Sequence, residues 1–215
     1  MPCIAALTLT AKKKSLTNSE RNPYKRAWHW RRIATCAVER LKFIEEAAVP
    51  TAMTRRYGRA APGERGAESI PRNSGCSTSV ISCLGWNGVA ATMTVDGAVD
   101  TLVFNTYVEQ VLRPSLPPGD ILVLDNLSAH KASCLEEVSA ACGVRVIWLP
   151  PYSPDYSPIE QLWSKVKETL RALKARTREA LEVALTAALQ LVRTTNIHGW
   201  FRHCGYEVAP KCKPL

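Results

Sequence analysis

The first regular pattern in the chain is a set of strands. Apolar and polar residues alternate over residues 41–47, a stretch that closes on two glutamates, as strands do when they deliver polar groups at their carboxyl end. Residues 50–78 are rich in Gly, Pro, Arg and Ser and are expected to form a loop. Two further strands are predicted at residues 79–86 and 89–95. Asn87-Gly88 between them is a strong hairpin signal, so this pair is expected to be antiparallel.

Beyond residue 100 the pattern changes to alternating helices and strands. Helices are predicted at residues 100–113, 130–142, 158–175 and 178–192, and short buried strands at residues 120–125 and 144–149. This order predicts an α/β fold with a mixed sheet, an antiparallel meander followed by βαβα, flanked by helices. A right-handed crossover would place strand 120–125 beside strand 41–47.

Charge divides the chain into unequal parts. The 215 residues carry 28 Lys and Arg against 19 Asp and Glu, a net charge of +9. Residues 1–40 hold nine basic and two acidic residues, or +7, which leaves +2 for the remainder. We therefore expect a basic arm at 1–40 with helical character near residues 24–33, a compact domain at 41–206 and a tail at 207–215. The excess of positive charge favours a polyanionic partner.

Other function classes are disfavoured. No apolar run approaches the length of a membrane span, and no basic residue precedes the apolar opening as in a secretory signal. The eight cysteines form no C-x-x-C pair, which argues against a zinc finger. We expect reduced thiols in a cytoplasmic protein without membrane partners.

Acids lie at three predicted strand or helix ends, where the chemistry of such sheets gathers: Glu45 or Glu46, Asp125 and Glu160. Phosphodiester cleavage or transfer needs charge neutralisation and in-line placement, which two divalent ions can supply. Magnesium prefers hard carboxylate oxygens. Two adjacent strands and one helix could present the three acids to such ions.

Each acid also has a structural alternative. Asp125-Asn126 could be turn chemistry that closes a strand. Ser157-Pro-Ile-Glu160 has the form of a capping box, so Glu160 could serve only its own helix. Glu45 and Glu46 could be ordinary strand charges, and His130 a residue at a helix start. From the residues alone, both interpretations stay open.

Two long motifs carry a family resemblance. Residues 121–131 (ILVLDNLSAHK) and 149–165 (LPPYSPDYSPIEQLWSK) closely resemble the catalytic half of DDE transposases, in the bacterial insertion-sequence branch related to the mariner superfamily (insertion sequence six-hundred-and-thirty type). That family places its second acid in D-N-x-x-x-H and its third in P-Y-S-P-x-x-N-P-I-E, thirty-four residues apart. Here thirty-four residues, 126–159, also separate the two acids. The resemblance extends through residues 53–59, 62–65 and 200–206.

The resemblance implies a ribonuclease-H-like fold and DNA strand cleavage and strand transfer at transposon ends. By implication Glu45, Asp125 and Glu160 are catalytic and hold two Mg²⁺ (or Mn²⁺) ions, with Glu46, Asn126 and His130 in support. The implied partners are DNA with terminal inverted repeats and TA target DNA, bound by a homodimer at the bacterial nucleoid. The expected DNA-binding residues are Lys12, Lys13, Lys14, Lys25, Arg26, Arg31, Arg32, Arg55, Arg56 and Lys165.

The sequence departs from the family in three respects. Glu45 stands where the family has Asp, and Ser157 stands where it has Asn. The N-terminal helix-turn-helix modules that read inverted repeats are largely missing, so residues 1–40 are expected to be a linker remnant of a truncated protein. The alternative function is a catalytically degenerate DNA-binding remnant. A general ribonuclease-H-like nuclease shares the acids, but the motifs between Asp125 and Glu160 favour the transposase.

Overall fold

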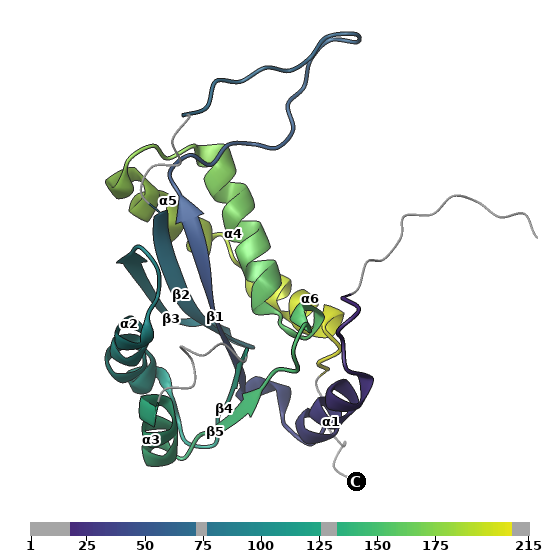
Figure 1. Ribbon diagram of the computed structural model, residues 1–215, viewed down its shortest axis with the longest axis vertical. Helices are drawn as coiled ribbons and strands as arrows, with labels where there is room; N and C mark the ends of the chain where they lie inside the picture. The colour runs from purple at the N-terminus through teal and green to yellow at the C-terminus, as the bar shows by residue number, and fades with distance from the viewer. Residues whose placement is uncertain (1–17, 72–76, 126–132, 208–215) are drawn as a thin grey trace, which may run out of the picture.

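A five-stranded sheet forms the centre of the protein (Figure 1). The structure is a computed structural model, and it describes residues 18–71, 77–125 and 133–207. Its strands are β1 (Leu41–Pro50), β2 (Ser77–Gly85), β3 (Gly88–Asp96), β4 (Ile121–Leu124) and β5 (Arg145–Trp148). Their order is β3-β2-β1-β4-β5, so β4 lies beside β1 as the crossover argument predicts.

The sheet is mixed. β1 pairs antiparallel with β2 and parallel with β4, β2 pairs antiparallel with β3, and β4 pairs parallel with β5. The predicted hairpin is present, although Gly85 pairs with Gly88, so the turn itself is Trp86-Asn87. Residues 51–71 form no helix or strand, as expected from their composition.

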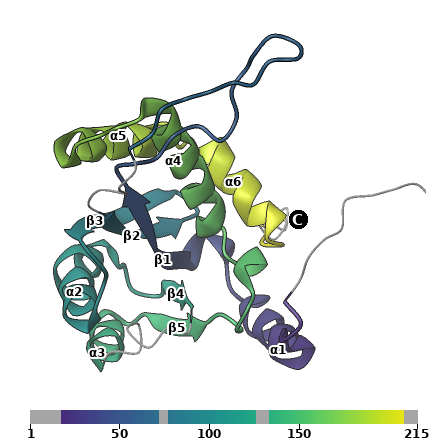
Figure 2. The same ribbon diagram turned by 45° about the horizontal axis from the view of Figure 1, so that its top comes forward.

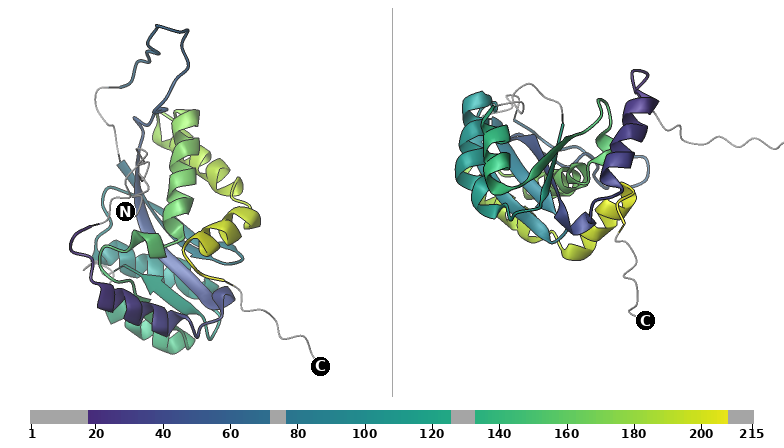
Figure 3. Two further views of the ribbon diagram at one scale, coloured as in Figure 1. Left: turned by 90° about the vertical axis from the view of Figure 1, so that its right-hand side faces the viewer. Right: turned by 90° about the horizontal axis from the view of Figure 1, so that it is seen from below.

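Helices cover both faces of the sheet. They are α1 (Pro23–Ile33), α2 (Thr101–Thr106), α3 (Ser133–Cys142), α4 (Ile159–Leu173), α5 (Arg178–Gln190) and α6 (Thr194–His203), with shorter helical turns η1 (Val38–Arg40), η2 (Tyr107–Leu112), η3 (Arg113–Ser115) and η5 (Pro154–Tyr156). Figures 1 and 3 show α2 and α3 on one side and α4, α5 and α6 on the other. The helix predicted at 100–113 is divided between α2 and the π-type turn η2, and α6 was not predicted.

The alternation of β1 decides which side chains meet α4. Phe43, Ala47 and Val49 belong to the core beneath α4, α5 and α6, whereas Ile44 belongs to the core beneath α2 and α3. Because successive side chains of a strand point to opposite faces, Glu45 shares the α4 face with Phe43. Glu46 shares the other face with Ile44.

The acids of β1 lie in mid-strand, and the prediction that the strand ends on them was wrong. β1 runs on to Pro50 because residues 46–50 stay paired with β2 after β4 has ended. No helix in the described part of the chain is long and apolar enough to cross a membrane.

Candidate active site

β1 and β4 bring two of the predicted acids together. Their parallel pairing ends at Ile44 opposite Leu124. Glu45 and Asp125 are the next residues along the two strands, so they lie at the carboxyl edge of β4. The register that pairs Phe43 with Val123, both in the α4-side core, also directs Glu45 and Asp125 toward α4.

α4 supplies the third acid from its first turn. Ile159, Leu162, Trp163, Val166 and Leu170 bury one stripe of this helix against the sheet. The helix starts after Pro158 without a side-chain cap, so the capping box that was the structural alternative for Ser157 and Glu160 is not formed. Glu160 lies close enough to Glu45 to raise the pKa of that carboxyl. Glu160 lines the same cleft as Glu45 and Asp125, and its role in a site stays a prediction.

The three acids line one cleft of about 410 Å³. Each of them is half-buried. The opposite wall is residues 150–154, the proline-rich segment that carries the motif before α4. Tyr152 on this wall has a φ of 57°, in the left-handed region that side chains other than glycine rarely occupy. Tyr152 was not among the residues predicted from the sequence, although backbone strain of this kind concentrates at functional sites.

Glu45 is electrostatically unfavourable as a carboxylate. Burial, followed by the nearby Glu160 and Asp125, raises the pKa of Glu45 to about 9, and Lys167 opposes the rise. Within the described residues Glu45 Oε2 has no hydrogen-bond partner. A buried oxygen beside further acids is a position that a cation would stabilise.

The donor chemistry fits a divalent ion. Mg²⁺ and Mn²⁺ are bound by carboxylate oxygens, and this cleft presents such oxygens from three elements. Among the described residues, however, no group of three or more Asp, Glu, His or Cys side chains is arranged so that it could hold a metal ion. Burial and the neighbouring acids disfavour the ionised form of Glu45, and a bound cation would relieve this cost.

α4 continues from the cleft with polar residues that sequence analysis did not assign to the site. Ser164, Lys167 and Arg171 follow Glu160 at helical spacing and lie beside the buried stripe. Lys167 is close enough to lower the pKa of Glu45. In the sequence, this polar row on α4 is visible as polar residues at positions i+4, i+7 and i+11 from Glu160.

α1 is attached to the wall of the cleft. Arg26 pairs with Asp155 through Nη2 and Oδ2 at 2.7 Å, and its guanidinium lies 3.7 Å from the centre of the Tyr156 ring. Arg21 also pairs with Asp155 and donates to the Tyr152 carbonyl. The predicted domain boundary at residue 40 stays a prediction, but α1 itself packs on the body of the protein.

The remaining predicted residues are distributed differently. Lys25, Arg31, Arg32, Arg55 and Arg56 are exposed, while Arg26 and Lys165 already have protein partners, since Lys165 Nζ lies 2.7 Å from Asn196 Oδ1. Figure 2 shows α4 beside α6, which carries that asparagine. Glu46 lies on the face of β1 away from α4. Lys12, Lys13, Lys14, Asn126 and His130 lie outside the described residues.

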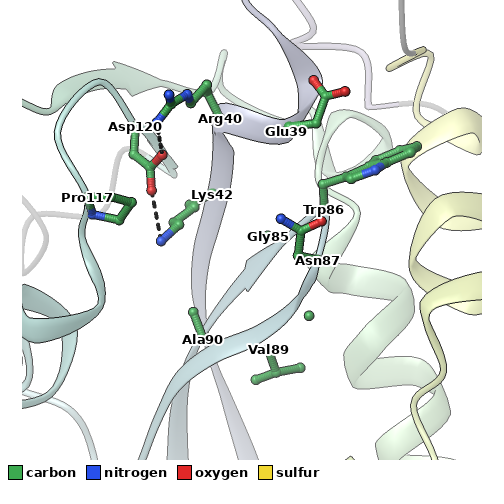
Figure 4. Close-up of a pocket in the computed structure, with 11 residues that line it drawn as sticks. Glu39, Arg40, Lys42, Gly85, Trp86, Asn87, Val89, Ala90, Pro117 and Asp120 are labelled. Carbon is green, nitrogen blue, oxygen red and sulfur yellow. Dashed lines mark ion pairs between the residues drawn. The ribbon is translucent and has the colours of Figure 1, made fainter.

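A second cavity, of about 510 Å³, lies at the opposite end of β1 and β4 (Figure 4). Asp120, 2% exposed, precedes β4 there. Lys42 Nζ lies 2.8 Å from Asp120 Oδ2, and Arg40 Nη1 lies 3.6 Å from Asp120 Oδ1. Lys42 also donates to the Ser115 carbonyl at 2.6 Å. The carboxylate in this cavity is balanced by cations of the protein itself.

Comparison with known proteins gives concordant results. A family model described as DDE superfamily endonuclease matches residues 40–182. The chain is similar to the transposable element Tcb2 transposase of Caenorhabditis briggsae, with 25% identity over 108 residues that cover 48% of this chain and 40% of that protein. The chain thus spans less than half the length of this curated relative.

Solved structures show the same architecture. The Mos1 mariner paired end complex with Mn matches with a TM-score of 0.72 and 16% identity, over 93% of this chain and 66% of that one. The Mos1 transposase catalytic domain with Raltegravir and Mg matches with a TM-score of 0.62 and 14% identity, over 85% and 89%. The predicted α/β, ribonuclease-H-like fold is thereby confirmed.

Proposed function

Because the chain belongs to the DDE superfamily endonucleases, we propose that it is the catalytic part of a transposase that cuts transposon-end DNA and joins it to a target. One observation carries the proposal: Glu45, Asp125 and Glu160 come from β1, the end of β4 and α4 and line one cleft. The thirty-four residues between the last two acids support a place among mariner-related bacterial insertion-sequence transposases.

The three acids would together hold two metal ions. Bound divalent ions would neutralise phosphate charge and stabilise the attacking and leaving oxygens of an in-line displacement. A bound cation would displace the proton of Glu45. In the metal-free protein, burial and the other acids raise the pKa of this carboxyl. Glu160 is held in place because Ile159 and Leu162, which flank it in the first turn of α4, are buried. Glu46, Asn126 and His130 are proposed to act in support.

The proposed partner is DNA, both the terminal inverted repeats of the transposon and a TA target. A homodimer would bind this DNA at the bacterial nucleoid. The exposed cations Lys25, Arg31 and Arg32 on α1, with Arg55 and Arg56 after β1, can contact phosphates without rearranging the fold. Arg26 and Lys165 would have to give up Asp155 and Asn196 first, so we assign them positioning roles. Lys12, Lys13 and Lys14 are proposed to add non-specific affinity.

A cleavage assay tests the proposal. The protein is incubated with Mg²⁺ or Mn²⁺ and a labelled transposon-end duplex, and with supercoiled plasmid as a substrate of no particular sequence. Asp125→Asn should lower metal-dependent cleavage about 10³-fold, because an ion-stabilised transition state is worth several kcal/mol. Asp96→Asn, which changes an exposed acid at the end of β3, is the matched control. Cleavage that survives Asp125→Asn contradicts the assignment.

A second candidate is a DNA-binding protein without catalysis. It is favoured by Glu45, whose side chain is one methylene longer than the Asp that the family motif carries, in a site type that tolerates errors of about 0.5 Å. If Glu45 is the defect, the wild-type protein binds DNA without cutting it and Glu45→Asp gains cleavage. If wild type already cuts, and Glu45→Asp does not improve it, this candidate is wrong.

A further inference from the structure

A second groove lies two to three helical turns from the acidic cleft, between α4 and the segment that follows β1. Its volume is about 520 Å³, and its lining includes Arg55, Arg56 and Tyr57 from that segment and Glu168 and Arg171 from α4. Figure 1 shows the segment passing the upper end of α4 before it projects from the body. Tyr57 is 89% exposed.

The segment is held against α4 by specific contacts. Arg176 donates to the carbonyls of Thr51 and Met53, both at 2.9 Å. Thr54 Oγ1 lies 2.8 Å from Glu68 Oε2, and Lys174 pairs with the same glutamate. These bonds join both arms of the segment to the end of α4, so the groove between them is part of the fold.

The groove has more positive charge than its own acids balance. Three arginines face one acid, Glu168, which leaves an excess of two positive charges. Among the described residues Arg55, Arg56 and Arg171 take part in no ion pair. Burial, and then the nearby Arg56, lowers the pKa of Arg171, while Glu168 opposes this. Two guanidinium groups brought together in this way favour an anion between them.

A row of polar side chains on α4 runs from the cleft to the groove. Glu160, Ser164, Lys167 and Arg171 form one polar row on α4, and eleven residues of helix separate its ends by about 16 Å. A DNA strand advances about 3.4 Å per nucleotide along the duplex axis, so this row spans about five nucleotides. A strand whose scissile phosphate lies at the acids therefore reaches the arginines within half a helical turn.

We propose that the groove between α4 and residues 51–71 binds a backbone phosphate of the DNA strand that passes through the acidic cleft. Arg56 and Arg171 clamp that phosphate, because the planar guanidinium matches phosphate oxygens in a two-point contact. Arg55 adds charge at the mouth of the groove. This inference rests on the proposed function for the direction of the strand, and it adds Arg171 and a defined phosphate position to it.

The test is DNA binding without catalysis. Affinity for a labelled 30-base-pair duplex of random sequence is measured by fluorescence anisotropy in EDTA, at several salt concentrations from about 50 to 200 mM. The variants are Arg56→Gln and Arg56→Gln/Arg171→Gln. The matched control is Arg113→Gln/Arg145→Gln, which also removes two exposed cations, but at the opposite end of the sheet. Thermal midpoints show whether each variant is folded.

The groove double variant should bind about tenfold more weakly near 0.1 M salt. The slope of log affinity against log salt should fall by about 0.9, the value for one lost phosphate contact. Arg56→Gln, on an exposed loop residue, should lose about half of that slope with an unchanged thermal midpoint. A groove variant that binds as tightly as the control double variant overturns the proposal.

Failure of this inference is distinct from failure of the proposed function. If wild-type protein cleaves DNA through Asp125 but the groove variants bind normally, the groove assignment alone is wrong. If the groove variants lose affinity as expected but wild type does not cleave, phosphate binding stands and the catalytic proposal fails.

Discussion

The two ends of the β1–β4 pair treat a buried carboxylate in opposite ways. At the amino end, Asp120 is almost completely buried and is balanced by Lys42 and Arg40 (Figure 4). At the carboxyl end, Glu45 lies beside two other acids, and its pKa is raised by burial, Glu160 and Asp125. The strands are the same, and only the neighbouring charges differ.

The difference separates a structural ion pair from a ligand site. An acid whose charge is balanced within the protein stabilises the fold without any ligand. A buried acid next to other acids lowers the stability of the fold until a cation binds. Such arrangements are found at functional sites. The electrostatic contrast supports the acidic cleft as the site of chemistry, although both ends of the sheet contain a cavity of several hundred Å³.

The largest expected effect on stability comes from breaking the balanced end. Asp120→Asn keeps the shape of the side chain but leaves the largely buried Lys42 ammonium without its carboxylate. Removing one partner of a buried pair costs about 3 kcal/mol in the free energy of unfolding, measured by urea denaturation.

A double variant provides the control for that experiment. In Asp120→Leu/Lys42→Met both charges are replaced by apolar groups of similar size, and most of the stability should return. If Asp120→Asn unfolds at the same urea concentration as wild type, Asp120 is not a structural ion-pair partner and the contrast between the two ends is wrong.

The next effect, that of Glu45→Gln, is an increase in the free energy of unfolding, whereas Asp120→Asn lowers it. Glu45 holds its proton more tightly in the folded protein, with a pKa of about 9, than in the unfolded chain, so the folded state binds more protons between pH 4.5 and 9. Metal-free wild type should therefore lose stability as the pH rises through this window, by at most about 1.4 kcal/mol per pH unit. Glu45→Gln should remove this loss and be more stable than wild type at pH 8.

Metal addition sharpens the same measurement. Mg²⁺ or Mn²⁺ at pH 8 should raise the thermal midpoint of wild type, because an ion bound only by the folded protein stabilises it. Glu45→Gln should respond less. Equal responses in both proteins would show that Glu45 takes no part in ion binding.

The smallest expected effect concerns α1. His29 is 1% exposed and stacks on Tyr156 at a ring separation of 5.7 Å. Burial lowers its pKa, and Arg32 and Arg26 add to this, while the Trp148 backbone opposes it. The unfolded chain then binds a proton more readily near pH 6.5 and below, so stability falls as the pH drops through this range. His29→Phe, which keeps the stacking, should reduce this loss of stability at low pH, measured as urea midpoints at pH 5.5, 6.5 and 7.5. If the variant loses as much stability at low pH as wild type, another group is responsible.

Most elements were predictable because their signals are local. The hairpin between β2 and β3, the apolar stripe of α4 and the short buried strand of β4 follow from residues near one another in the chain. α6 was not predicted, because the apolar residues that fix it, Ile197 and Phe201, gain their meaning only from packing beneath α4 and β1. The π-type turn η2 likewise interrupts a continuous helical pattern.

The site was predictable as a set of residues but not as an electrostatic arrangement. The motifs around Asp125 and Glu160 indicate the acids, yet they do not distinguish the Glu160 of a capping box from a Glu160 that meets Glu45. They also do not show that Arg26 is paired with Asp155 while Arg56 and Arg171 line one groove. Those facts depend on residues that are far apart in the sequence.

The sequence by itself determined the order of the elements, the alternation that directs Glu45 toward the α4 face, and the spacing between Asp125 and Glu160, because each follows from the geometry of a strand, a helix or a short motif. Tertiary structure alone decided which charges meet. β1 runs past the end of β4, and Glu45 is largely buried there beside Asp125 and Glu160, whereas Asp120, at the other end, is neutralised. Electrostatic energy depends on distance and burial, and neither is local to the chain.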